Sequence, residues 1–295
     1  MKVEYNGVDI TNHIEINKCW LDQYSEEHGD TIKIIFSNPN TWDLWGAKPG
    51  DTIRVYDDNV DSGVQFVRGI YPSVGKYEIT SSSLPVSNKR NIGWQQMTKL
   101  QLAKDIADRY DLELKTFGVT DHKFLYLRQE NEEDFPFFQK LCLLEGDAFV
   151  VYNKQFILYS KSYLEDQSPT KTVSIDADNK PDYQNKETYT ALSLRNGSTE
   201  YTYGSDLSKI KSVKMSVYID SEGTAERYAK NLYAYFNQNK KGGTFYTVPI
   251  TDGYTAGSVA GLETRGMSSF DGNIFIYHVR HDMTNNKTKV FFRCL

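Results

Sequence analysis

Histidine and cysteine side chains are the first candidates for chemistry in this sequence, because imidazoles and thiolates act as metal ligands and nucleophiles. The nearest approach to a ligand pair is His278 and His281, two of the five histidines. Strand residues three apart point to opposite faces of a sheet, so these two side chains are not expected to converge on one ion. Cys142 falls on the apolar stripe of an expected helix, which favours a buried core thiol over a nucleophile.

Carboxylates form the densest cluster of reactive side chains, at Glu130, Glu132, Glu133 and Asp134. A glycosidase uses such groups in pairs, as acid and base. Acidic residues at a helix start also complement the positive end of the helix dipole, and we favour this role. The sequence contains no H-E-x-x-H, C-x-x-C, P-loop or G-x-S-x-G motif. We therefore predict a protein that is not an enzyme, with no catalytic residues, metal site or cofactor.

Aromatic and basic residues leave two weaker alternatives open. Trp42, Trp45 and Trp94 could stack on sugar rings, although such residues more often fill cores or subunit interfaces. Lys240-Lys241 could bind phosphate, but it follows an expected helix, whose C-terminus favours cations in any case. Lys89-Arg90 is an isolated basic pair. A binding site is not established by any of these residues.

Length and charge narrow the class of protein. The chain has 295 residues and a mass of 33.9 kDa, so we expect two or three domains. A net charge of −5 argues against a protein built mainly to neutralise nucleic-acid phosphates or anionic lipid. We find no apolar run long enough for a membrane span and no secretory signal. Three cysteines without short spacing fit a reducing compartment, which together predicts a cytosolic product.

The pattern of apolar residues divides the chain into three parts. Residues 1–90 contain short β-branched and aromatic runs separated by turn signals, with strands expected at 31–36, 52–56, 64–68 and 76–80. Residues 91–165 change to a helical period. Residues 166–295 return to strands, at 213–219, 257–264, 274–280 and 288–293, with one helix at about 224–239. Short strands with such turns favour small barrels.

Local signals within the middle part predict its helices and hairpin. Thr98-Lys99-Leu100-Gln101 has the form of a capping box. A second helix is expected from an N-cap near Asn131 to a stop at Gly146. A hairpin is expected around Asn153-Lys154. These elements describe a compact α/β unit.

The two β regions resemble each other faintly. Gly50-Asp51 precedes a strand that is followed by Phe66, and Gly257-Ser258 precedes a strand that is followed by Phe275. We interpret Gly50, Asp51, Gly257 and Ser258 as equivalent barrel turn positions. The predicted fold is therefore mainly β with an α+β insert: two similar small barrels flank the insertion, and one helix lies within the second barrel.

In order and spacing, these segments resemble the gp27-like baseplate hub family of contractile phage tails, which includes the late control D protein and the hub portion of VgrG. The matching segments are residues 29–36 and 48–55, then 127–135, 138–142 and 145–146, and then 225–236, 257–259 and 277–281. The chain ends after its last barrel strand without a β-helical spike, unlike VgrG, so we expect the spike to be a separate protein.

The resemblance implies a structural function. Family hubs are homotrimers in which two similar barrels per chain make a pseudo-sixfold ring that joins a hexameric tail tube to a trimeric spike. The implied partners are the spike, the tube or tube-initiator protein, and the tape-measure and baseplate wedge proteins, without sequence-specific nucleic-acid binding or membrane insertion. The protein would be made in the bacterial cytoplasm and assembled into a virion or tail-like particle. The alternative is a tail-associated glycan-binding or peptidoglycan-degrading protein.

Overall fold

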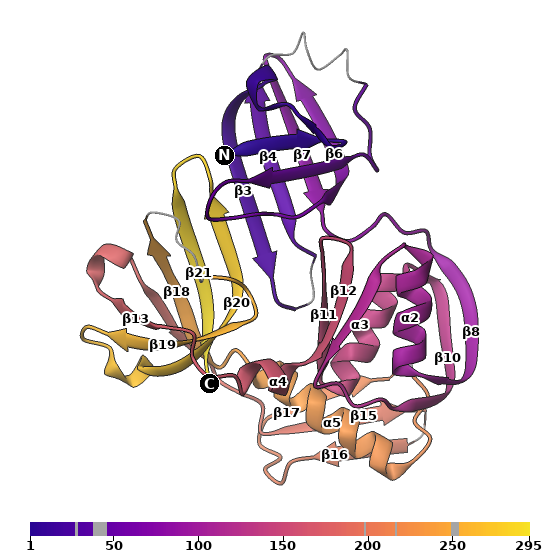
Figure 1. Cartoon of the computed structure of the whole chain (residues 1–295). Coiled ribbons are helices and arrows are strands. Elements are labelled where there is room, and N and C mark those ends of the chain that lie inside the picture. The colour runs from indigo at the N-terminus through magenta and orange to yellow at the C-terminus, as the bar shows by residue number, and fades with distance from the viewer. Residues whose placement is uncertain (27–28, 38–45, 198, 216, 249–253) are drawn as a thin grey trace.

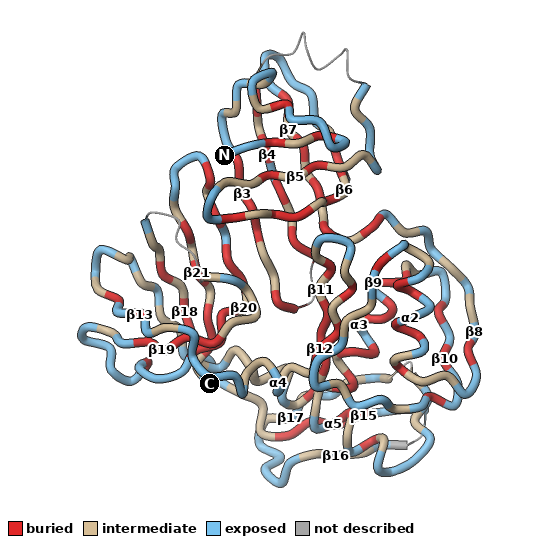
Figure 2. Tube along the Cα trace, viewed as in Figure 1, coloured by how far each residue is buried: buried red, intermediate tan, exposed pale blue. Residues whose placement is uncertain are grey.

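The computed structural model describes residues 1–26, 29–37, 46–197, 199–215, 217–248 and 254–295. Two β-modules and an α/β unit surround a central junction, with the first module above the other two parts (Figure 1). Figure 2 shows the buried residues inside each part, and they form three separate hydrophobic cores. No described helix combines the length and the apolar character that crossing a bilayer requires.

The first β-module is a sheet in which every neighbouring pair is antiparallel. Alternating residues of its strands face one core, as in β4, where Ile32, Ile34 and Phe36 are buried. The strand order is β3-β4-β7-β6-β5-β1, with the two-residue β2 (Val8–Asp9) beyond β1. The strands are β1 (Lys2–Tyr5), β3 (Glu15–Tyr24), β4 (Thr31–Ser37), β5 (Thr52–Tyr56), β6 (Gln65–Ser73) and β7 (Lys76–Ser82).

The second β-module follows the same path. Its order is β14-β18-β21-β20-β19-β13, so each strand has a counterpart at the same place in the first module. Only the last pair differs, because β13 runs parallel to β19 whereas β1 runs antiparallel to β5. The strands are β13 (Thr172–Ile175), β14 (Asp182–Asn185), β18 (Lys241–Thr247), β19 (Ser258–Thr264), β20 (Gly272–Asp282) and β21 (Lys287–Cys294).

The correspondence extends to single residues. The β6–β7 ladder is interrupted by a bulge between Val67 and Gly69, and the β20–β21 ladder is interrupted between Ile276 and His278. The last pairs before these bulges are Val67 with Ser81 and Ile276 with Phe292. The predicted mainly β class with two similar modules is confirmed. Among the described strands, the pairings do not close either module into a ring.

The α/β unit contains the elements predicted for residues 91–165, with one shifted boundary. The Thr98–Gln101 capping box forms as expected, and Gly146 ends α3 in a left-handed conformation. The start of α3 was predicted near Asn131, but β10 continues to Glu132 and the helix begins at Asp134. The elements are β8 (Arg90–Thr98), α2 (Lys99–Arg109), β9 (Glu113–Phe117), β10 (Lys123–Glu132), α3 (Asp134–Glu145), β11 (Asp147–Tyr152), β12 (Gln155–Ser160) and α4 (Lys161–Glu165).

A small sheet and one helix are inserted in the chain between β14 and β18. The sheet has the order β16-β15-β17, and the strand predicted at 213–219 forms earlier, as β17. Helix α5 covers most of the range predicted for it, but its apolar side packs on α3, and Tyr228 and Leu232 share a hydrophobic core with Leu141. These elements are β15 (Ala191–Asn196), β16 (Thr199–Tyr203), β17 (Ile210–Lys214) and α5 (Glu222–Asn237).

Candidate functional site: the junction of the two β-modules

The two β-modules are joined edge to edge through β3 and β20. The second half of β20 pairs antiparallel with the second half of β3, so that Arg280 lies opposite Asp22 and His278 lies opposite Tyr24. The first half of β20 pairs with β19 instead. One continuous sheet therefore runs through both modules.

A cluster of polar and charged side chains crosses this junction, in which Asp22 and His278 are buried and Arg280 is exposed. Asp22 is 7% exposed, and one of its carboxylate oxygens lies 2.7 Å from His278 Nε2 and 2.7 Å from Arg280 Nε. Burial alone would raise the pKa of Asp22, but the hydrogen bonds from His278 and Arg280 outweigh burial and hold its pKa below the usual value. The His278 ring is stacked between Tyr24 and Phe291, with centroid distances of 4.4 and 4.2 Å. These polar and stacking contacts connect β3 of the first module with β20 and β21 of the second.

His281 has a different set of partners from His278. Its Nδ1 lies 2.9 Å from Thr288 Oγ1, and its Nε2 lies 3.3 Å from Gln23 Oε1. Burial lowers the pKa of His281 to about 4, so the ring is neutral at pH 7. The two candidate histidines thus support the junction separately. Within the described ranges, no group of three or more His, Cys, Asp or Glu side chains is arranged to hold a metal ion.

A second cluster, of buried charged side chains, joins three parts of the chain behind the β3–β20 pairing. Glu26, just after β3, accepts hydrogen bonds from Arg293 of β21 at 2.6 Å and from Lys161 of α4 at 2.8 Å. Glu165 also contacts Arg293, at 2.5 Å. Burial would raise the pKa of Glu26, but Lys161 and Arg293 outweigh it and lower that pKa. With Arg293 only 2% exposed, these charges depend on one another for compensation.

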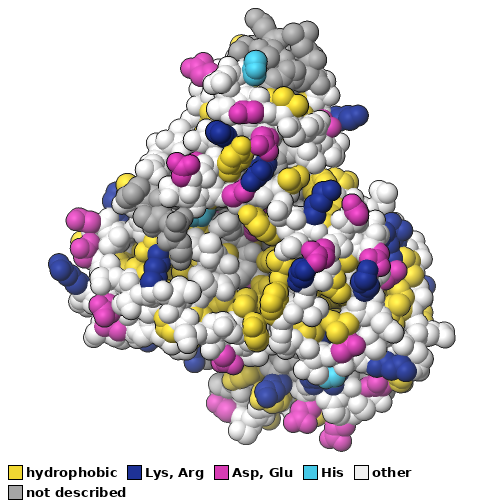
Figure 3. Space-filling model, in the orientation of Figure 1, with side chains coloured by type: hydrophobic (Ala, Val, Ile, Leu, Met, Phe, Trp, Pro, Cys, Tyr) yellow, Lys and Arg dark blue, Asp and Glu magenta, His cyan; other side chains and the backbone are white. Residues whose placement is uncertain are grey.

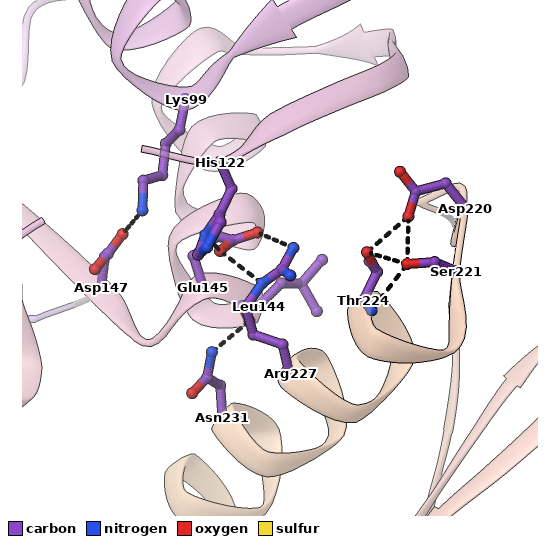
Figure 4. Close-up of polar contacts among 10 residues, drawn as sticks. All are labelled: Lys99, His122, Leu144, Glu145, Asp147, Asp220, Ser221, Thr224, Arg227 and Asn231. Atoms are coloured by element: carbon purple, nitrogen blue, oxygen red, sulfur yellow. Dashed lines mark hydrogen bonds and ion pairs between the residues drawn. The ribbon is translucent and has the colours of Figure 1, made fainter. Parts of the chain in front are cut away.

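The α/β unit is held to α5 by a polar contact at the end of α3 (Figure 4). The Glu145 carboxylate lies 2.6 Å from His122 Nδ1 and accepts hydrogen bonds from Arg227 Nε and Nη2 at 3.1 and 3.2 Å. Asn231 of α5 donates to the Leu144 carbonyl at 2.8 Å. Because these bonds satisfy a carboxylate and a C-terminal carbonyl of α3, they fix α5 against this helix end.

Two further polar features lie near that contact in Figure 4. Lys99 at the start of α2 forms a buried ion pair with Asp147 at the start of β11, and burial raises the pKa of Asp147 to about 6. Ser221 caps α5 by accepting from the Thr224 N–H at 3.2 Å. Both features are structural, since their polar groups pair with one another.

Two of the four predicted turn positions, Gly50 and Gly257, have similar backbone geometry. Gly50 and Gly257 both have a positive φ, +95° and +89°, and both donate from the backbone N–H to the neighbouring strand, to Val67 at 2.9 Å and Ile276 at 2.8 Å. Those acceptors are the residues just before the two bulges.

The side chains at the following positions differ between the modules. The Asp51 carboxylate accepts from the Tyr5 hydroxyl at 2.8 Å, whereas the Ser258 hydroxyl donates to the Thr255 carbonyl at 2.7 Å. The backbone arrangement is therefore what the two turns share.

The acidic cluster does not form a carboxylate pair. Glu130 pairs with Arg128, Glu132 with Lys140, and Glu133 accepts from Ser87. Asp134 is fully buried, and it accepts hydrogen bonds from Arg109 and Tyr110 at 2.6 and 2.7 Å. The four carboxylates thus have separate structural partners.

The remaining candidates are buried or lie outside the described residues. Cys142 is 1% exposed, and burial raises the pKa of its thiol. Trp94 is buried against Phe137, with ring centroids 5.4 Å apart. Trp42 and Trp45 fall outside the described residues. Cys142 and Trp94 therefore contribute to the core.

An apolar groove lies beside the junction, and hydrophobic side chains gather near the centre of the face in Figure 3. Val150 and Ile157 line the groove from the β11–β12 hairpin, and Phe117 and Tyr163 stack at its rim with centroids 6.2 Å apart. Its lining is suited to packing rather than to acid–base chemistry.

Sequence reasoning missed the residues that form the junction. Asp22, Glu26 and Arg293 are ordinary charged residues in local sequence, and they meet only when segments more than 250 residues apart pair. Arg293 gave no signal either, because it is buried although it lies out of phase with the inward-facing Val290 and Phe292 of its strand.

We compared the sequence and the fold with those of known proteins. No family model matches the sequence, and no curated protein matches it. A tail protein from Neisseria meningitidis has a TM-score of 0.75 at 11% identity, covering 99% of this chain and 95% of that one. The 43 kDa tail protein of prophage MuSo2 from Shewanella oneidensis has a TM-score of 0.71 at 9% identity, with the same coverage.

A third similar structure connects the fold to gp27. It is an E. coli component of the type VI secretion system, described as similar to the tail proteins gp27 and gp5 of bacteriophage T4, with a TM-score of 0.63 at 10% identity over 100% of this chain and 77% of that one. These likenesses show that the chain has the fold of gp27-like tail proteins. The predicted resemblance is therefore confirmed at the level of the fold.

Proposed function

We propose that this protein is the structural hub of the baseplate of a contractile phage tail or a related tail-like particle. Three copies would form a ring in which six β-modules alternate, so that a hexameric tube protein could bind one side and a trimeric spike the other. The observation that carries the proposal is the repeated strand path of the two modules, joined edge to edge within one chain. A closed ring needs self-consistent head-to-tail contacts, and a duplicated module lets three chains present six of them.

The buried carboxylates at the junction and in the α/β unit support a structural rather than a catalytic role. Asp22, Glu26, Glu145 and Asp147 are each held by a cation from another element. A general acid or base needs a proton exchangeable with a substrate, which these engaged and buried groups do not offer.

The test is to co-express the chain with its neighbouring tube and spike genes and to measure the mass of the complexes in solution. The proposal expects three copies of this chain per spike trimer. A chain that stays monomeric at all concentrations and ignores both partners would refute it. Incubation with peptidoglycan distinguishes the glycan alternative, for which buried Trp94 provides no stacking surface.

A further inference from the structure

The two modules differ at one sheet edge. In the second module this edge, on β20, is paired with β3, and in the first module the corresponding edge, on β6, is open among the described strands. In the second module, β20 uses its first half to pair with β19 and its second half to pair with β3. In the first module, β6 uses its first half to pair with β5. Among the described strands, the outer edge of its second half, residues 69–73, pairs with none.

The strand that could pair with this open edge, β14, also has an open edge in the described part of the chain. In the first module, β3 pairs with β4 on one side and with β20 on the other. Its counterpart β14 pairs with β18 on one side. In the described part of the chain, the other edge of β14 has no strand beside it. The monomer thus has one complete junction and two separate halves of a second one.

We infer that β14 of one subunit pairs antiparallel with the second half of β6 of the next subunit, as β3 pairs with β20 within the chain. This rests on the proposed trimeric hub and specifies the contact that closes it. Intrachain and interchain junctions would then alternate around the ring. Each junction would pair the first strand of one module's order (β3 or β14) with the fourth strand of another module's order (β20 or β6).

The paired ladders fix the register. When the two modules are aligned on their bulges, Tyr71 of β6 corresponds to Arg280 of β20. Following the strand pairs from there to the first strand of each module, Gln184 of β14 corresponds to Asp22 of β3. Since Arg280 lies opposite Asp22 within the chain, Tyr71 should lie opposite Gln184 of the partner subunit.

The side chains suit that pairing. Tyr71 is 58% exposed, and both Ser73 and Lys76 at the end of this hairpin are exposed as well. Two residues beyond Tyr71 on the same face of β6, Ser73 would lie opposite the exposed Asp182 of the neighbouring copy. The Asp182 carboxylate would then be close to the Lys76 ammonium. Pro72, which aligns with His281, has no N–H donor, so the interchain ladder would have one hydrogen bond fewer than the β3–β20 ladder.

Disulfide trapping tests the register directly. In the double variant Tyr71→Cys/Gln184→Cys, the two thiols belong to strands seven positions apart in one sheet, about 30 Å along it, so they can bond only between subunits. We expect linked dimers and trimers on a non-reducing gel, which collapse to one band on reduction. Ser73→Cys/Asp182→Cys, at a second expected pair of exposed positions, should behave alike.

The matched control shifts one cysteine by a single residue. In Tyr71→Cys/Asn185→Cys the side chains point to opposite faces of the sheet, so we expect no linked species. A protein that is trimeric in solution but gives no linked product from either designed pair overturns this register and leaves the trimeric hub standing. Absence of a trimer, with and without the spike and tube proteins, overturns both.

Introducing charges at Tyr71 and Gln184 provides an independent test that does not depend on oxidation. Tyr71→Glu/Gln184→Glu places like charges opposite each other at every interchain junction, and we expect a lower trimer fraction that recovers with added salt. Tyr71→Lys/Gln184→Glu should restore or increase the trimer fraction. Equal trimer fractions in the two variants at low salt would contradict the proposed pairing.

Discussion

Replacing Asp30 with Asn should stabilise the protein in a pH-dependent way. Asp30 lies just before β4, it is 9% exposed, and one of its carboxylate oxygens accepts the Tyr24 N–H at 2.8 Å. Burial raises the pKa of Asp30 to about 7; the Tyr24 hydrogen bond opposes this shift, and the nearby Asp22 charge adds to it. Asn keeps the acceptor for Tyr24 but carries no charge.

The expected magnitude follows from the difference in pKa between the folded and unfolded states. A change from 3.8 to about 7 corresponds to a cost of at most about 4 kcal/mol. Because the folded state binds the proton more tightly, the free energy of unfolding falls as the pH rises from about 4 to 7. The full cost is present above pH 7 and absent below about pH 4. Asp30→Asn should therefore match the wild type at pH 4 and exceed it at pH 8.

Urea unfolding of both proteins between pH 4 and 8, followed by tryptophan fluorescence, measures this difference. Other groups that titrate in this range, such as Asp147, are common to both proteins and largely cancel. Asp58→Asn, at an exposed aspartate, is the control for the substitution itself and should leave the free energy of unfolding nearly unchanged. A difference between wild type and Asp30→Asn that is constant with pH, or that grows toward low pH, would refute the reasoning.

Three further substitutions test the junction. Arg293→Met leaves Glu26 without one of its two cations and should lower the free energy of unfolding by about 3–5 kcal/mol, whereas the exposed Arg265→Met should leave it nearly unchanged. Gly257→Ala should cost about 1 kcal/mol, because the added methyl group has room but φ is +89°. Burial depresses the pKa of His281 in the folded state, so the free energy of unfolding of the wild type should fall, by about 3 kcal/mol at most, as the pH falls from 6.5 to 4. His281→Gln should not show this fall. Urea titrations measure all three, and a pH-independent difference for His281→Gln would contradict its assignment.

Local signals in the sequence were sufficient for the elements whose geometry is set by neighbouring residues. The Thr98–Gln101 capping box and the hairpin at Asn153-Lys154, whose two turn residues both have positive φ, formed where they were expected. The start of α3 was misjudged because Asn131, also at positive φ, lies at an irregularity of β10 rather than at a helix cap. A positive φ for Asn fits either situation, so the residue type alone does not separate them.

Long-range pairing was beyond what local patterns encode. The strand pattern predicted a strand at 274–280, within β20, but none at β3, and no local property indicates that Asp22 should face Arg280 from the other end of the chain. For α5, the apolar stripe was recognised, yet its packing on α3 depends on Asn231 and Arg227 reaching the end of that helix. Which element covers an apolar face depends on tertiary packing, and this is why the fold class could be predicted while the junction could not.

The side chains of the intrachain junction differ from those of the proposed interchain junction, and the difference is explained by when each one would form. Within a chain, β3 and β20 are always available to each other, so Asp22 can be buried because its cation is always present. In the proposed ring, the edges of β6 and β14 would stay exposed until subunits meet, and a charge buried there would be uncompensated on assembly with a wrong partner. Neutral Tyr71 and Gln184 at the equivalent positions avoid that penalty. On this reasoning the interchain contact is the weaker of the two, and assembly should depend on subunit concentration and on the spike.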